Sequence, residues 1–393
     1  MNVYLDNGAT TIVDKEVEKV MLPYFDEKYG NPSSIHTFGQ EAKAAIEKSR
    51  ETIANILNAD PSEIFFTSGG TESNNWTIKG VAFANKEKGK HIITTKVEHD
   101  CVLESCSWLE KQGFEVTYLD VDEEGFVKID ELKKNLRKDT ILVSIIHGNN
   151  EIGTLNDLDE IGKICKENKV YFHTDACQSF TKVPLDVKKT NIDLVTINSH
   201  KIYGPKGVGA LYIRKGTKVE IWQHGGGHES GKRAGTENVP GIVGFAKASQ
   251  LTSEEDIKRM SELRDYFIEQ VEKNIHEIKV NGPRDKRLCN NVNIIFKYIE
   301  GEGLLIRLDD KGVEASTGSA CSSKSLEPSH VLTAMGIPHS IAHGSLRFSL
   351  SKYTTKEELD YALKMLKDEV ANLRDLSPLW DSSREKRTFK GDQ

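Results

Sequence analysis

The chain has 393 residues, of which 29% are charged and 37% hydrophobic, and it carries a formal net charge of -7. This length favours one large and one smaller domain, and the acidic balance argues against a nucleic-acid binder, which would present a basic face. No apolar run approaches the about 20 residues that span a bilayer, and the N-terminus lacks the basic and then apolar pattern of a signal peptide. We therefore expect a cytoplasmic protein with neither nucleic acid nor membrane as a partner.

Short apolar runs alternate with amphipathic stretches between about residue 60 and residue 215. Strands that alternate with helices indicate a mostly parallel sheet covered on both faces. The sequence therefore predicts an α/β fold whose large domain holds a mostly parallel seven-stranded sheet flanked by helices. The predicted strands are Ile64–Thr67, His91–Thr95, Glu115–Leu119, Thr140–Ile146, Val170–Thr174, Leu194–Asn198 and Gly209–Ile213, and the predicted helices between them include Thr71–Lys86, Cys101–Gln112 and Leu158–Asn168.

A smaller α+β domain is expected to follow a long charged helix at Ser253–Asn274. Its predicted strands are Val292–Phe296 and Ser345–Ser349, and its last helix, Thr355–Arg374, begins with a capping box. We divide the chain into a large domain, residues 13–256, and a small domain, residues 1–12 and 257–393. The small domain would contain a loop at about 315–330 and a polar C-terminal tail.

Polar residues follow the predicted strands, at the edge where ligands bind in folds of this kind. The turn Ser68-Gly-Gly-Thr-Glu-Ser73 precedes a helix, and backbone N–H groups in that position favour a phosphate. An ordinary capped Gly-rich turn has the same composition. His99 suits stacking on a planar cofactor or proton transfer, and a hydrogen-bonded histidine at a domain seam is the alternative.

A carboxylate and an amine follow two further strands. Asp175 needs a cation if it is buried, which a protonated pyridine nitrogen or a structural arginine would supply. Lys201 would be costly in the interior unless its charge is lost or used, for example in a Schiff base with a carbonyl cofactor. A lone lysine at a strand end is more often a surface residue. Together with His99 and the anion-binding turn, the set matches the requirements of pyridoxal 5'-phosphate.

Six cysteines are scattered through the chain without any Cys-x-x-Cys pair, which is poor spacing for structural zinc and fits free thiols in a reducing compartment. Most are predicted to be small core residues: Cys101, Cys106, Cys165, Cys177 and Cys289. Cys321 differs, because its neighbours are small and polar and a reactive thiol must be accessible.

Ordered motifs extend over nearly the whole chain and carry a family resemblance. They are Leu5-Asp-Asn-Gly-Ala-Thr-Thr11, Gly30-Asn-Pro-Ser-Ser34, Thr67–Asn75, Val97-Glu-His99, Asn149-Asn-Glu-Ile-Gly153, Asp175-Ala-Cys-Gln178, Ser199-His-Lys-Ile-Tyr-Gly-Pro-Lys-Gly207, His224-Gly-Gly-Gly-His-Glu229, Gly235-Thr236 and Ser316-Thr-Gly-Ser-Ala-Cys321. With these motifs the chain resembles the cysteine desulfurases of the NifS/IscS type, which are class V aminotransferase-like, fold-type I pyridoxal-phosphate enzymes.

The resemblance implies a role for each matching residue. Lys201 would hold the cofactor and act as the base at the substrate's α-carbon, Cys321 would form a persulfide, and His99 would stack on the cofactor ring. The implied cofactor-binding residues are Gly70, Thr71, His99, Asn150, Asp175, Gln178, Asn198, Ser199, His200, Lys201 and, from the second subunit of a homodimer, Thr236. Arg347 would bind the substrate carboxylate, with Asn31 and Asn150 as helpers. No metal ligands are expected.

The implied reaction converts L-cysteine to L-alanine and passes the sulfur to an iron–sulfur scaffold or another acceptor protein. The alternatives are a selenocysteine lyase, another pyridoxal-phosphate transferase, or a non-catalytic assembly scaffold. A metal site at His224, His228 and Glu229 is a weaker alternative. The chain departs from the family pattern at Asn198, where many relatives carry serine, at Gly70, where some carry alanine, and in the tail Asp381–Gln393.

Overall fold

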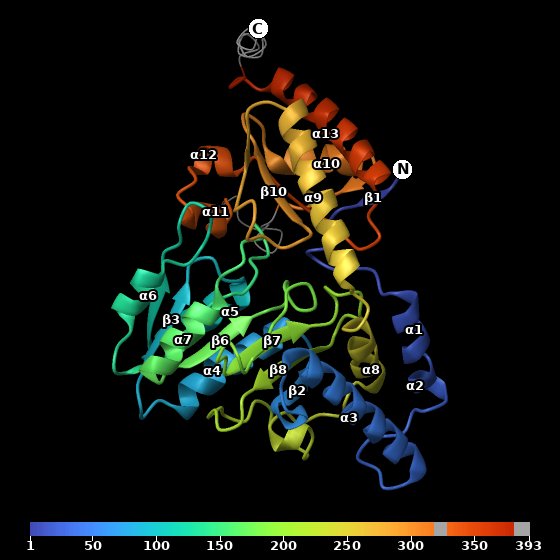
Figure 1. Ribbon diagram of the computed structural model, residues 1–393, viewed down its shortest axis with the longest axis vertical. Helices are drawn as coiled ribbons and strands as arrows, with labels where there is room; N and C mark the ends of the chain where they lie inside the picture. Colours follow the sequence, from blue (N-terminus) through green and yellow to red (C-terminus); the bar gives the residue numbers. More distant parts are fainter. Residues whose placement is uncertain (318–327, 381–393) are drawn as a thin grey trace.

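The computed structural model describes residues 1–317 and 328–380 (Figure 1), so Cys321 and the tail Asp381–Gln393 lie outside the described residues. Figure 1 shows one part of the molecule built on a large sheet and a second part built on a small sheet, with a long helix, α9 (Glu254–Asn274), entering the second part. None of the helices in the described ranges combines the length and apolarity that a bilayer crossing requires.

The large sheet has seven strands in the order β2-β8-β7-β6-β5-β3-β4. The run β4-β3-β5-β6-β7 is parallel, whereas β8 is antiparallel to both β7 and β2, so the predicted mostly parallel sheet is confirmed. The strands are β2 (Ile64–Thr67), β3 (His91–Thr95), β4 (Glu115–Leu119), β5 (Thr140–Ser144), β6 (Tyr171–Asp175), β7 (Leu194–Asn198) and β8 (Gly209–Ile213).

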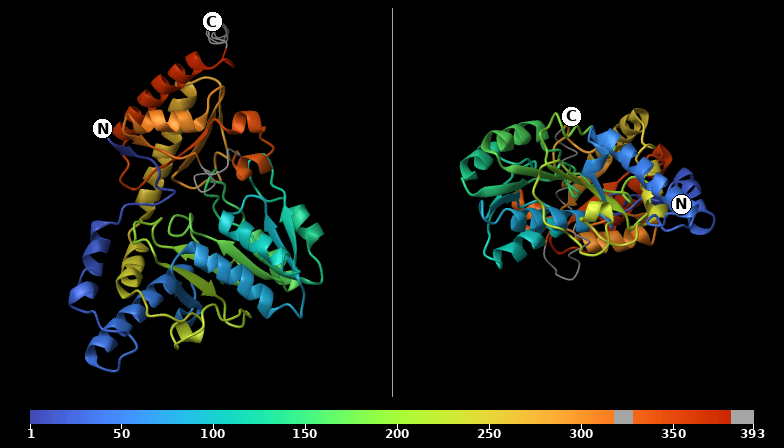
Figure 2. Two further views of the ribbon diagram at one scale, coloured as in Figure 1. Left: turned by 180° about the vertical axis from the view of Figure 1, so that it is seen from behind. Right: turned by 90° about the horizontal axis from the view of Figure 1, so that it is seen from below.

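Helices cover both faces of this sheet, which is why β5, β7 and β8 are buried at every position rather than at alternate ones. On one face, α3 (Thr37–Leu57), α7 (Leu158–Asn168) and α8 (Val239–Ala248) share a core with the sheet. On the other, α4 (Gly70–Ala84) and α5 (Asp100–Glu110) bury Trp76 and Leu109. Figure 2 shows the sheet and its helices from behind. The shorter helices are α1 (Lys15–Met21), α2 (Pro23–Asp26) and α6 (Ile129–Asn135).

The small sheet is antiparallel, with β10 (Asn291–Phe296) between β12 (Ser345–Ser349) and β9 (Ile278–Val280). Helices α9, α10 (Gly301–Asp309) and α13 (Lys356–Leu376) pack in the same core. The N-terminal strand β1 (Val3–Tyr4) pairs in parallel with β11 (Val313–Glu314), so the start of the chain lies beside the small sheet (Figure 1). The division into residues 13–256 and residues 1–12 with 257–393 stays a prediction.

Two short helices, α11 (His330–Ala334) and α12 (His339–Ala342), join the small part to the large one. Val331 and Leu332 of α11 share a core cluster with Val97, which follows β3, and with Ile152, which follows β5. This apolar contact closes one side of the space between the two sheets, so it fixes the ends of β3 and β5 relative to the small sheet.

The predicted start of a helix is correct where a capping box defines it. The Thr355 side chain accepts from the Glu358 N–H at 3.2 Å and the Glu358 side chain accepts from the Thr355 N–H at 2.8 Å, so α13 starts where the sequence places it. It ends at Leu376, two residues later than predicted, because no glycine or proline stops it earlier. The predicted strand Thr140–Ile146 was too long, since its regular pairing ends at Ser144.

Candidate active site

The ends of β2, β3, β5, β6 and β7 meet at one edge of the large sheet. The chain passes from β3 outward to β4 and then returns to the other side of β3 for β5, β6 and β7. Ligands bind where the strand order reverses in this way. A cavity of about 330 Å³ lies there. The predicted site residues that line it are Gly70, Thr71, His99, Asn150, Asp175, Gln178, Asn198, His200, Lys201 and Arg347.

The remaining predicted site residues are not in this lining. Ser199 is buried, and Thr236 and Asn31 are exposed, with the Asn31 side chain accepting from the Ser33 N–H at 2.9 Å. Within a single chain the structure therefore does not bring Thr236 or Asn31 to the cavity. Cys321 lies outside the described residues, and all of these roles stay predictions.

Sequence reasoning missed several lining residues: Gly8, Ala9, Asn74, Cys101 and Cys177. Gly8, Ala9 and Asn74 belong to motifs that carried the resemblance, so their presence in those motifs was the available signal. Cys101 and Cys177 were expected to be core residues, and Cys177 is indeed buried, but both residues line the cavity.

Asp175, at the end of β6, is a buried carboxylate with two hydrogen-bond donors. The Asn74 side chain donates to Oδ2 at 2.6 Å, and the Cys177 backbone N–H donates to Oδ1 at 2.8 Å. Burial raises the pKa of Asp175, but the Cys177 N–H bond, nearby His99 and the Asn74 bond outweigh it, so the pKa lies below its usual value. The carboxylate is thus ionised and suited to a protonated ring nitrogen.

His99 is the N-cap residue of α5, and its Nδ1 accepts from the Cys101 backbone N–H at 3.2 Å. The cap fixes the ring over the cavity, because it ties the side chain to the first turn of the helix. Burial, followed by the charge of Lys201, lowers the pKa of His99. The imidazole is therefore neutral at neutral pH, as a ring that stacks on a planar cofactor should be.

Lys201 lies in the loop between β7 and β8, and the N-terminal segment holds this loop in place. The Thr11 N–H donates to the His200 carbonyl at 2.9 Å, and the Thr11 hydroxyl accepts from the Tyr203 N–H at 2.8 Å. Beneath the loop, the buried Lys182 donates from Nζ to the carbonyls of Gln178 at 3.0 Å and Lys201 at 3.3 Å. The loops after β6 and β7 are thereby joined by one ammonium group.

The N-terminus of α4 is shaped to admit an anion. Gly69 has a φ of 153°, which favours glycine, and a Cβ on Gly70 would lie 2.6 Å from the Cys177 sulfur. A side chain at position 70 would therefore require the Cys177 sulfur to shift. The buried Oδ1 of Asn198 has no hydrogen-bond partner among the described residues. The free N–H groups of the first helical turn, with His200 opposite, fit a phosphate.

His200 is neutral in this environment, since burial, followed by the charges of Lys201, Lys206 and Lys182, lowers its pKa to about 4. Its Nδ1 lies 3.3 Å from the Thr10 hydroxyl. A neutral imidazole provides one N–H donor for an anion. The donors at the start of α4 and on His200 therefore fit the phosphate of pyridoxal phosphate, and the ionised Asp175 fits its protonated ring nitrogen.

Arg347 reaches the cavity from β12 of the small sheet. Its Nη2 donates to Asp6 Oδ1 at 2.9 Å and its Nη1 donates to the Asn150 carbonyl at 2.9 Å. Its buried Nε and the buried Asn150 Oδ1 have no hydrogen-bond partner among the described residues. The Nε–H group of Arg347 is thus left to donate to a further carboxylate, while Nη2 is already bonded to Asp6.

Both described flanks of residues 318–327 lie beside this part of the site. Ser316 exchanges backbone hydrogen bonds with Arg347, at 2.6 Å and 3.1 Å. Ser329, the N-cap of α11, donates its hydroxyl to the buried Glu151 at 2.5 Å. The segment that contains Cys321 therefore begins and ends at residues held next to the Arg347 side of the cavity.

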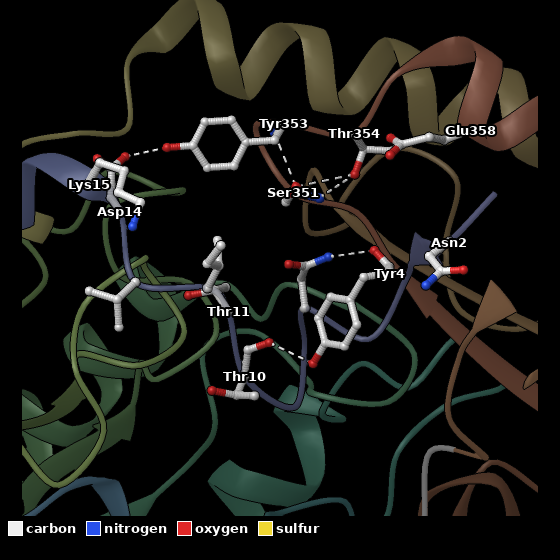
Figure 3. Close-up of a pocket in the computed structure, with 13 residues that line it drawn as sticks. Asn2, Tyr4, Thr10, Thr11, Asp14, Lys15, Ser351, Tyr353, Thr354 and Glu358 are labelled. Carbon is white, nitrogen blue, oxygen red and sulfur yellow. Dashed lines mark hydrogen bonds between the residues drawn. The ribbon is translucent and has the colours of Figure 1, made fainter. Parts of the chain in front are cut away.

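A larger cavity of about 660 Å³ lies elsewhere, between the N-terminal segment and the loop that precedes α13. Figure 3 shows Tyr353 and Asp14 joined across one side of it and Tyr4 hydrogen-bonded to Thr10 on another. It contains no lysine–aspartate–histidine set and no strand end of the large sheet. The smaller cavity is therefore the candidate active site.

The alternative metal site is not formed, because Glu229 has other partners. It makes a bidentate ion pair with the buried Arg50, at 2.8 Å and 2.9 Å, and accepts from the Phe66 N–H at 2.7 Å. No group of three or more His, Cys, Asp or Glu side chains within residues 1–317 and 328–380 is arranged to hold a metal.

Fold-type I pyridoxal-phosphate enzymes share this architecture, and the two sheets and the position of the cavity place the chain in that class. The chain belongs to the aminotransferase class-V family, whose model matches residues 3–362. A cysteine desulfurase IscS from Dictyoglomus turgidum is 59% identical over 379 residues, which cover 96% of each chain.

Solved structures give the same result. A NifS-like protein is 42% identical, covers 95% of this chain and 100% of its own, and superposes with a TM-score of 0.89. A structure of SspA in complex with cysteine is 38% identical, covers 90% of this chain and 100% of its own, and has a TM-score of 0.82.

Proposed function

We propose that the protein is a pyridoxal-phosphate-dependent cysteine desulfurase, a sulfurtransferase that converts L-cysteine to L-alanine and transfers the sulfur to Cys321. The observation that carries the proposal is one cavity in which Lys201, the ionised Asp175 and an incompletely paired Arg347 meet. The similarity to an IscS cysteine desulfurase over 96% of the chain, and to a protein solved with cysteine, supports it.

Residues of the chain match each part of the cofactor. When bound, pyridoxal phosphate supplies a carbonyl carbon for exchange with the substrate amine and a ring that delocalises negative charge from the substrate's α-carbon. Asp175 would keep the ring nitrogen protonated and His99 would cover one face of the ring, while Gln178 has an amide hydrogen left after its bond to the Gly8 carbonyl at 2.8 Å. The start of α4, with Gly70 and Thr71, and the side chains of Asn198 and His200 bind the phosphate.

Three residues act on the substrate. Arg347 binds the carboxylate through Nε and through the donor that it shares with Asp6. Asn150, whose carbonyl accepts from Arg347, would accept from the substrate amine through its unpaired Oδ1. Lys201 Nζ takes the proton from the α-carbon and later returns a proton to the β-carbon, so one amine acts as base and acid.

The sulfur step needs a thiolate, which we assign to Cys321. Its sulfur forms an S–S bond with the substrate sulfur while the substrate Cβ–S bond breaks, and the electron pair of that bond remains with carbon. Protonation of the β-carbon and return of a proton to the α-carbon yield alanine, and the protein keeps the sulfur as a persulfide. The atoms balance without any external oxidant or reductant.

Further parts of the proposal concern assembly. We propose a homodimer in which Thr236 of each chain completes the phosphate site of its partner, because Thr236 is exposed and outside its own cavity. The persulfide sulfur passes to an iron–sulfur scaffold or another acceptor protein. The free cysteines Cys101, Cys106, Cys165, Cys177 and Cys289 fit a reducing compartment, and we propose the cytoplasm.

The test is anaerobic incubation of the holoenzyme with L-cysteine and a reductant, with alanine and sulfide measured together. Mass spectrometry of a reductant-free sample should find one added sulfur on the peptide that contains Cys321. The Cys321→Ser variant should keep the visible absorption of the cofactor and lose sulfide release. Undiminished sulfide release by this variant would favour another pyridoxal-phosphate activity, and a protein that binds no cofactor would favour a scaffold.

A further inference from the structure

Two side chains without a role in the proposed reaction lie between Asp175 and His99. Asn74 projects from α4 and is fully buried, and Cys101 is in the first turn of α5. The Asn74 amide nitrogen donates to Asp175 Oδ2 at 2.6 Å and to the Cys101 sulfur at 3.1 Å. Its orientation is fixed, because the reversed amide would set its oxygen against the carboxylate.

The Cys101 sulfur continues the chain of contacts. It lies 3.1 Å from His99 Nδ1, the same nitrogen that accepts from the Cys101 backbone N–H at 3.2 Å. Burial, followed by the charge of Asp175, raises the pKa of the Cys101 thiol to about 12, so the sulfur carries its hydrogen at neutral pH. Since Asn74 already donates to this sulfur, the thiol hydrogen is free to point at Nδ1.

We propose that Cys101 is a positioning residue that completes a hydrogen-bonded chain from Asp175 through Asn74 to His99 and holds His99 with its proton on Nε2. The backbone N–H and the S–H of Cys101 both donate to the lone pair of Nδ1. The neutral ring therefore keeps a hydrogen-bond donor at Nε2 and has no free acceptor nitrogen. The chain of bonds stands on geometry alone, and only its kinetic consequence rests on the proposed function.

The charges around His99 set the direction of the expected effect. Burial, which is the largest effect, Lys201 and His330 disfavour the imidazolium, while Asp175 and Asp100 favour it, and the net result is a lowered pKa. The S–H bond to Nδ1 also favours the neutral ring, because a protonated Nδ1 would direct its own hydrogen at two donors. Removing the S–H group should therefore raise the pKa of His99.

The direct test is infrared spectroscopy of the S–H stretching band, measured on the full-length protein with and without pyridoxal phosphate. The difference between wild type and Cys101→Ala isolates the band of Cys101, which should lie at lower wavenumber than that of an unbonded thiol. In His99→Ala the same band should move to higher wavenumber. Cys106, which is buried in the same helix, is the matched control, because its band should not respond to His99→Ala.

The kinetic test compares Cys101→Ala with Cys101→Ser, whose hydroxyl can still donate. In the profile of kcat/KM against pH, the acidic limb should move up by about half a pH unit in Cys101→Ala and return towards wild type in Cys101→Ser. A purely structural role would not separate the two variants in this way. The proposal would be overturned if the acidic limb lay at the same pH in both variants, or if the S–H band of Cys101 kept its wavenumber in His99→Ala. If no alanine forms from cysteine, the proposed function fails while the infrared result still decides the hydrogen-bonded chain.

Discussion

Two sheets contribute polar side chains to the same cavity, and these side chains differ in how completely they are hydrogen-bonded. On the large sheet, the Asp175 carboxylate has both oxygens hydrogen-bonded, and Lys182 fixes the carbonyls of Gln178 and Lys201. On the small sheet, Arg347 shares its fork with Asp6 and leaves Nε unpaired among the described residues. In the proposed reaction the first side would hold the cofactor. On the second side, Arg347 would exchange Asp6 for the substrate carboxylate.

The largest effect is expected on the large-sheet side, at Lys201. Lys201→Ala should lower the rate of alanine formation by about 10²–10⁴-fold, because the amine acts directly on the α-carbon proton. Steady-state kinetics with L-cysteine would measure it. Lys215→Ala, an exposed lysine after β8, is the control and should keep the wild-type rate. If Lys201→Ala stays within tenfold of wild type, the base is another group.

Lys182 tests whether the large-sheet side depends on a buried charge. Burial lowers the pKa of Lys182 to about 8, below its ordinary 10.5, so between these pH values the unfolded chain binds one more proton than the folded one. Stability relative to Lys182→Met should therefore rise by about 3 kcal/mol from pH 8 to pH 10.5. Urea unfolding at several pH values measures the difference.

At neutral pH the same Lys182→Met variant leaves the Gln178 and Lys201 carbonyls without the ammonium donor. We expect the variant to release pyridoxal phosphate faster than wild type, as followed by the loss of visible absorption after dilution. A difference in stability that does not change with pH would show that Lys182 titrates normally.

The small-sheet side is tested by a pair of variants with opposite effects. Arg347→Lys loses the planar fork and should raise KM for cysteine by about 10- to 100-fold, with a smaller change in kcat. Asp6→Asn removes the carboxylate that competes for the same guanidinium and should lower KM slightly. Equal KM values in wild type and Asp6→Asn would mean that Asp6 does not compete with the substrate.

An effect on stability rather than on activity is expected at the seam between the two parts, where Asp14 accepts from Lys352 at 2.8 Å and from the Tyr353 hydroxyl. Burial opposes ionisation here, but these two bonds prevail and lower the pKa of Asp14 from 3.8 to about 2. Its contribution of about 2 kcal/mol should be present above pH 4 and disappear as the pH falls through 2. Unfolding of Asp14→Asn against pH, with the exposed Glu16→Gln as control, checks it.

The strands were predictable because each is a short apolar run in a sheet covered on both faces, as β2, β7 and β8 show. The helix α13 was predictable from its capping box. The short helices α11 and α12 gave no such signal, because they are stabilised by packing against Val97 and Ile152 from the other part of the molecule. Local sequence does not report a contact of that range.

The candidate site divides in the same way. Asp175, His99 and Lys201 could be predicted because each follows a predicted strand and the ends of parallel strands converge. Cys101 could not, since only the fold sets its sulfur between Asn74 and His99. The close approach of Gly70 to the Cys177 sulfur could not be predicted either, because it depends on how two separate loops lie against each other.

The sequence by itself determined which chemical groups the protein has and the order in which the strands deliver them, because hydrophobic periodicity and motif residues are local properties. Only the tertiary structure decided which of these groups share a cavity and which partners set their protonation. Burial and hydrogen bonding between distant segments make Asp175 an anion and His99 neutral. These are properties of the folded environment, so residue identity alone does not contain them.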